Sequence, residues 1–192
     1  MTADRRSVRD RILDTAAELF YQVGARAVGV DLVVARSGVA KTSLYRHFRT
    51  KDDLIAAVLE RDDAGYWRAW DEVGGRDHAD PVAELVAHLT WIDEYTMGKG
   101  YRGCPFINVA TEFPTPDHPA RAVAARHKRE LRRRLAELAD RAGIADPASL
   151  SDQLVLLVDG AYVDGHLLGR KGPARALVPA AQALIAAAAR PA

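Results

Sequence analysis

The 192-residue sequence is poor in cysteine and has no long hydrophobic run. Its single cysteine, Cys104, cannot form a disulfide within the chain, and rare cysteine is typical of a reducing compartment. No stretch of about 18 uncharged apolar residues could cross a membrane, and residues 1–12 lack the apolar core of a signal peptide. We therefore expect a cytoplasmic protein with no membrane partner.

Arrangements of histidine and cysteine typical of metal sites and of catalysis are also lacking. The six histidines, at positions 47, 78, 88, 118, 127 and 166, are scattered, and none are paired at the spacing of metal ligands. No histidine and acid form a recognisable local arrangement that would activate Cys104 as a nucleophile. We therefore expect no metal, no other cofactor and no enzymatic activity.

The chain does contain a succession of segments with helical periodicity. Hydrophobic residues make up 48% and charged residues 28%, as in folded globular proteins, and alanine supplies much of the apolar fraction. No alternating pattern typical of a β-strand is bounded by turn residues, whereas helix candidates follow one another to the end. The sequence predicts an all-α fold of about nine helices.

Charge is divided unequally along the chain. The formal net charge of +1 conceals ten Lys and Arg against five Asp and Glu up to Lys51, a formal +5, and a formal −4 over the remaining 141 residues. A basic N-terminal quarter on a slightly acidic body suggests a nucleic-acid-binding module attached to a second domain.

The first three predicted helices have the spacing of a helix-turn-helix. An amphipathic helix follows Ser7 and ends near Gly24, and two short helices then flank the turn at Ser37-Gly38. Gly38 suits a position of positive φ after a helix end. Leu44 and Phe48 lie four residues apart and are expected in the core.

The segment 38–54, GVAKTSLYRHFRTKDDL, resembles the TetR-type transcriptional regulators. The resemblance covers roughly the first 55 residues strongly and thereafter consists of helix count and length. It implies a helix-turn-helix DNA-binding domain over residues 1–50, a ligand-binding and dimerisation domain over residues 51–192, and a homodimer that binds a double-stranded DNA operator. It also implies a small-molecule effector, and repression is the expected mode of action.

The second helix of the motif is expected to enter the major groove of DNA. Side chains at its start reach base edges, where lysine donates to guanine O6 and N7 and threonine contacts thymine. The resemblance assigns Tyr45 and His47 largely to phosphates, although a half-buried core position is an alternative for Tyr45. The expected DNA-binding residues are Lys41, Thr42, Ser43, Tyr45, Arg46, His47 and Lys51.

One position departs from the family pattern. Many members carry Thr or Ser where Gly29 stands, so the cap of the second helix falls to Asp31 or is weak. Asp31 would also reduce the positive potential near DNA. We expect Arg5, Arg6 and Arg9 to offset it, with a solvated tail as the alternative.

The body contains aromatic residues that suit a pocket for a small apolar or aromatic molecule. Core packing is the alternative for each of them. Polar anchors are expected among Asn108, Glu112 and Asp93. The predicted ligand-binding residues are Trp67, Trp70, Trp91, Tyr95, Cys104, Phe106, Asn108 and Phe113.

Three further predictions concern the remaining features. Cys104 is either a buried structural residue or the reactive group of a thiol-based redox regulator, which is one alternative function for the protein. The second alternative function is a helical ligand-binding protein without DNA activity. The arginine-rich helix at about 120–141 is expected to be a solvated helix with ion pairs to Glu130 and Glu137. The last two helices, about 151–189, are more apolar than peripheral helices need to be, which predicts a four-helix dimer interface. The residues that suggest it are Leu154, Leu157, Val158, Ala161, Tyr162, Leu177, Ala181, Leu184 and Ile185.

Overall fold

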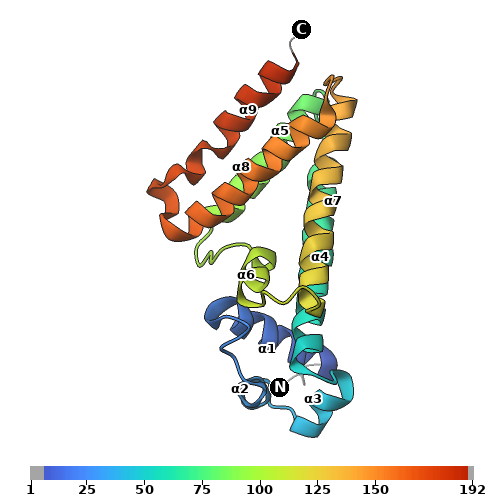
Figure 1. Cartoon of the computed structure of the whole chain (residues 1–192), viewed down its shortest axis with the longest axis vertical. Helices are drawn as coiled ribbons and strands as arrows, with labels where there is room; N and C mark the ends of the chain where they lie inside the picture. The colour runs from blue at the N-terminus through green and yellow to red at the C-terminus, as the bar shows by residue number, and fades with distance from the viewer. Residues whose placement is uncertain (1–6, 190–192) are drawn as a thin grey trace. The chain divides into compact units, whose positions relative to one another are not determined.

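The computed structural model describes residues 7–189, apart from the side chain of Arg170, as an all-helical fold (Figure 1). This described part contains nine α-helices and no β-strand, which confirms the predicted fold class. The helices are α1 (Val8–Val23), α2 (Val30–Ser37), α3 (Lys41–His47), α4 (Lys51–Gly74), α5 (Pro81–Thr96), α6 (Pro105–Glu112), α7 (Pro119–Arg141), α8 (Pro147–Leu167) and α9 (Leu177–Ala188). Two short 3₁₀ turns, Gly169–Lys171 and Pro173–Ala176, connect α8 to α9.

The chain forms two compact units. Of the described residues, unit 1 contains 7–64 and 105–126, and unit 2 contains 65–104 and 127–189. The long helices α4 and α7 each contribute residues to both units. These units describe packing, so the expected division by function at residues 1–50 and 51–192 stays a prediction.

Within unit 1, local sequence signals set the ends of the first helices. The Ser7 side chain accepts a hydrogen bond from the backbone N–H of Asp10, which caps α1. Gly38 ends α2 in the left-handed conformation, with φ 65°, where an L side chain would be strained. Arg11 from α1 donates hydrogen bonds to the carbonyls of Ser37 and Gly38, so α1 holds the turn of the helix-turn-helix motif.

Within unit 2, α8 and α9 lie side by side and pack with α5 (Figure 1). The core of this unit takes Leu89 and Ile92 from α5, Leu154 and Val158 from α8, and Ile185 from α9, all 3% exposed or less. Among the described residues, no helix is long and apolar enough to span a membrane.

The residues that suggested a dimer interface are mostly part of this core. All but Leu157 and Leu184 are buried within one chain, so their apolar character is explained by packing inside the protomer. The exposed apolar residues of α8 are instead Leu156, Val163 and Leu167, which are 74%, 45% and 69% exposed. Their apolar character therefore does not by itself indicate an interface, because helical periodicity does not reveal which apolar face turns inward, and a dimer interface through α8 and α9 stays a prediction.

Candidate nucleic-acid interface

Helix α3 presents polar side chains to solvent and is anchored by two apolar ones. Leu44 is fully buried and Phe48, which follows the helix, is 4% exposed, as predicted. Tyr45 is 43% exposed, so it is not a core aromatic residue. Four more predicted DNA-binding residues, Lys41, Thr42, Arg46 and His47, are exposed, and Ser43 is half-buried.

Lys41 has a partner that was not predicted from the sequence. Its ammonium lies 2.6 Å from Asp31 Oδ1 on α2, and the hydrogen bond to Asp31 raises the pKa of Lys41 above its usual value. At the start of α2, Gly29 provides no side-chain capping hydrogen bond. The weak cap expected there is therefore observed, and Asp31 pairs across the motif.

Lys51 stands where a capped helix begins. The Thr50 hydroxyl accepts from the backbone N–H of Asp53 at 3.0 Å, and the Asp53 carboxylate accepts from the backbone N–H of Thr50 at 3.0 Å. This reciprocal capping box makes Thr50 the cap of α4. Lys51 Nζ donates to the Arg26 carbonyl at 3.1 Å, and partial burial lowers its pKa.

The loop between α1 and α2 is tied to α6 within unit 1. The backbone N–H of Arg26 donates to Glu112 Oε2 at 2.6 Å, and the Arg26 guanidinium donates to the Glu112 carbonyl at 3.2 Å. Gly24 has φ 100°, and a Cβ there would lie 3.3 Å from the Glu112 carboxylate oxygens. Glu112 was expected as a ligand anchor, and its contact with Arg26 could not be inferred because 86 residues separate the two.

One ion pair and one histidine–carboxylate contact join α4 to other segments of unit 1. Arg61 donates to Asp14 of α1 at 2.6 Å, and His118 Nε2 lies 3.4 Å from Asp52. These contacts link α4 to α1 and to the segment between α6 and α7. Of the N-terminal arginines expected near DNA, Arg9 stacks its guanidinium 5.4 Å from the Phe48 ring centre, and Arg5 and Arg6 lie outside the described residues.

The aromatic residues of unit 2 form a packed cluster around Tyr66. Its ring centre lies 4.9 Å from those of Trp67 and Trp91 and 4.7 Å from that of His127. Burial raises the Tyr66 pKa. Trp70 is 4% exposed and stacks on the buried ring of His88, with 3.8 Å between ring centres. Three predicted ligand-binding residues, Trp67, Trp70 and Trp91, are thus brought together in mutual contact.

The other predicted ligand-binding residues are distributed over both units. Tyr95, in unit 2, is 45% exposed and packs edge-on against Tyr101. Cys104, also in unit 2, is 4% exposed, which places its thiol in the core. The α6 residues Phe106 and Asn108 and the following Phe113 belong to unit 1.

Asn108 lines a small cavity within unit 1. The cavity has a volume of about 20 Å³ and lies between α1, α4 and α6, which is room for about one water molecule. Burial raises the pKa of Asp62, another lining residue. The remaining lining residues are Ala17, Phe20, Tyr21, Ile55, Val58, Leu59, Pro105, Val109 and Glu112.

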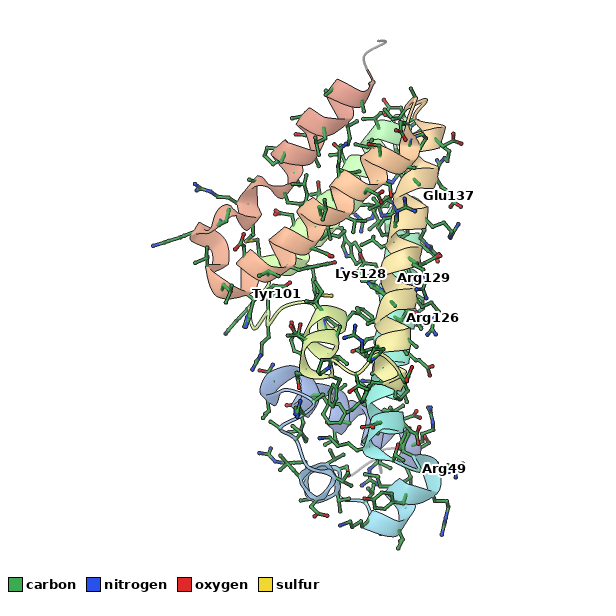
Figure 2. All side chains as sticks on the ribbon, viewed as in Figure 1. Arg49, Tyr101, Arg126, Lys128, Arg129 and Glu137 are labelled. Carbon is green, nitrogen blue, oxygen red and sulfur yellow. The ribbon has the colours of Figure 1, made fainter. Side chains whose placement is uncertain are left out.

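The arginine-rich helix α7 is a solvated helix with local ion pairs, as expected. Arg133 contacts both Glu130 and Glu137, and the hydrogen bond from Arg133 lowers the Glu130 pKa to about 2. Figure 2 labels Arg126, Lys128 and Arg129 along α7; Lys128 pairs with Asp159 of α8, and the two arginines are exposed. Within residues 7–189, no group of three or more His, Cys, Asp or Glu side chains could hold a metal ion.

Comparisons with known proteins identify the helix-turn-helix. Residues 12–58 match the family model described as bacterial regulatory proteins, tetR family. Residues of this chain are 43% identical over 53 residues to the transcriptional activator FasR of Mycolicibacterium smegmatis, a match that spans 28% of this chain and 24% of FasR. The chain is 28% identical over 137 residues to the transcriptional repressor Rv3405c of Mycobacterium tuberculosis. This match covers 71% of this chain and 69% of that protein.

The likeness extends over the whole fold. SCO4454, a TetR-family transcriptional regulator from Streptomyces coelicolor, is 30% identical, with a TM-score of 0.90 over 95% of this chain and 96% of that one. These relatives are regulators of transcription rather than enzymes. With its helix-turn-helix, its all-helical body and this similarity along its length, the chain belongs to the TetR family of DNA-binding transcriptional regulators.

Proposed function

We propose that this regulator is a ligand-responsive repressor that a small apolar or aromatic molecule releases from a palindromic operator. Regulators of this family bind DNA and small-molecule effectors and act as dimers. The relatives include both an activator and a repressor by name, and repression is the simpler mode because occupancy of a promoter suffices.

The DNA contacts are proposed from the exposure pattern of α3. Leu44 is buried while Tyr45, Arg46 and His47 face solvent, so the helix can enter a major groove without losing its anchor. Lys41 and Thr42 would reach base edges. Tyr45, His47 and Lys51 would contact phosphates and fix the position of the helix, with Arg46 and Ser43 beside them.

The hydrogen bonds between Arg26 and Glu112 are the main observation that supports a response to ligand. Arg26 holds Lys51 through its carbonyl and Glu112 through its N–H, so a shift of α6 or α4 would move the DNA-contacting groups. A ligand shifts this equilibrium only by binding one arrangement more tightly than the other. The Arg61 to Asp14 pair gives α4 a second hold on the motif.

The effector class is proposed from the aromatic residues of unit 2. All three tryptophans of the chain lie in the Tyr66 cluster, and aromatic walls favour apolar or aromatic ligands. Because the rings contact one another, ligand entry would require rings to move apart. A thiol switch at Cys104 is not favoured, since the side chain is 4% exposed.

The homodimer is proposed to form through α8 and α9. Leu156, Val163 and Leu167 are spaced by seven and four residues, so they share one exposed face of α8. On α9, Ala183 and Ala187 are exposed and small enough for close approach of a partner helix. Two such helices from each chain would make a four-helix interface.

Selection of bound sites from a random DNA pool tests this proposal. We expect a palindrome whose half-sites lie about one helical turn apart. Lys51→Ala should weaken binding to all sequences and reduce the salt slope by about one, whereas Lys99→Ala on an exposed turn should bind like the parent. Selection of no common site, or of one without twofold symmetry, would contradict the proposal.

A further inference from the structure

An acidic side chain lies beside the first residue of the recognition helix. Asp31 Oδ1, in the first turn of α2, is 2.6 Å from Lys41 Nζ, and the two side chains are 80% and 53% exposed. An exposed pair of this kind contributes little to folding stability. A carboxylate near phosphates opposes DNA binding, so its favourable place in the first turn of α2 comes at the expense of general affinity.

The position of Asp31 follows from that of Lys41. The inference rests on the proposed function, which places Lys41 at the floor of the major groove. A carboxylate within 2.6 Å of that ammonium enters the groove with it. The groove floor offers a carboxylate only two kinds of hydrogen-bond donor, the amino groups of cytosine N4 and adenine N6.

We infer that Asp31 and Lys41 together read one G·C base pair in each half-site. Lys41 donates to guanine O6 or N7, and Asp31 accepts from cytosine N4. Guanine O6 and cytosine N4 are hydrogen-bonded to each other and so lie roughly 2.9 Å apart. That separation is close to the 2.6 Å between the protein's donor and acceptor atoms.

The order of the groups, together with guanine N7, selects G·C over A·T. In an A·T pair the donor is on the purine and the acceptor on the pyrimidine, and the thymine methyl group lies beside that acceptor. A lysine directed at the purine then meets one acceptor, N7, next to a donor. In the reversed pair, with thymine facing Lys41, thymine O4 and adenine N6 keep the same order, but the thymine methyl group replaces the second acceptor, N7. The pair Asp31 and Lys41 therefore determines base specificity. Its carboxylate favours G·C over A·T at one position and lowers the affinity for DNA of any sequence.

Site selection and anisotropy titrations with the full-length protein test this inference. The variants are Asp31→Ala, Asp31→Asn and Lys41→Ala, with Glu18→Ala on exposed α1 as the control for lost negative charge. Asp31→Ala should bind random DNA severalfold more tightly at low salt while losing about tenfold of its preference for G·C at one position. Asp31→Asn should move that position toward A·T, since an amide pairs with adenine N6 and N7.

The remaining variants separate this inference from the proposed function. Lys41→Ala should lose both affinity and the same preference, and Glu18→Ala should select the parental site. If the parent selects a palindrome and Asp31→Ala selects it with unchanged base preferences, the inference falls and the proposed function stands. If the parent selects no site at all, both fall.

Discussion

The two compact units position their distinctive side chains by different means. In unit 1, the groups proposed to meet DNA are exposed and are held by hydrogen bonds and ion pairs, such as Lys41 with Asp31 and Lys51 with the Arg26 carbonyl. In unit 2, Trp70 and Tyr66 are held by contact with other rings. Exposed hydrogen bonds and ion pairs can be exchanged for DNA contacts with little loss of folding stability. Removal of a packed ring instead leaves a cavity, which destabilises the fold.

Truncation of one aromatic residue in each unit gives the largest predicted contrast. Trp70→Ala should destabilise the protein by about 3–5 kcal/mol, because it removes a large side chain that is 4% exposed. Tyr45→Ala, which removes a ring 43% exposed, should change stability by about 0.5 kcal/mol or less yet weaken DNA binding. Urea denaturation and anisotropy measure the two effects. A Trp70→Ala protein as stable as the parent would indicate a ligand pocket instead of a filled core.

Acidification should weaken unit 2 through His88. This ring is fully buried, neither nitrogen has a hydrogen-bond partner, and burial lowers its pKa to about 4. The unfolded chain, with a pKa near 6.5, therefore binds more protons, and stability is lost as the pH falls from about 6.5 toward 4. Between pH 7.5 and pH 5 the loss should be about 2 kcal/mol.

His88→Phe isolates this contribution, since a phenyl ring can keep the stacking on Trp70 without titrating. Urea denaturation of both proteins at pH 7.5, 6 and 5 should show the parent losing stability relative to the variant as the pH falls. A constant difference between them across this range would mean that His88 does not titrate as a buried neutral ring.

The smallest predicted effect concerns the tie between α6 and the loop of unit 1. Glu112→Ala removes the acceptor for the Arg26 N–H, which should cost about 1 kcal/mol and weaken operator binding by roughly fivefold. Glu112→Gln keeps an oxygen that can accept this bond and should retain most of the affinity. Equal affinity of Glu112→Ala and the parent would show that the tie does not position the DNA-contacting groups.

The sequence predicted unit 1 better than unit 2 because the signals of unit 1 are local. Ser7, Gly38 and Thr50 act on backbone groups within a few residues, so their roles can be derived from spacing alone. For Leu154 and Tyr162, periodicity revealed an apolar face but not whether it packs inside the chain or against a partner. Burial within one chain decided this, and the exposed face carries Leu156 instead.

By itself, the sequence determined the all-helical fold, the helix-turn-helix and its buried anchors Leu44 and Phe48, because capping, turns and helical periodicity depend on neighbours along the chain. Only the tertiary structure decided that Asp31 meets Lys41, that Arg26 meets Glu112 and that the tryptophans pack on one another. The pairs Asp31 with Lys41, Arg26 with Glu112 and Trp70 with Trp91 each join different segments of the chain. The side chains involved have several possible partners until the helices are packed together.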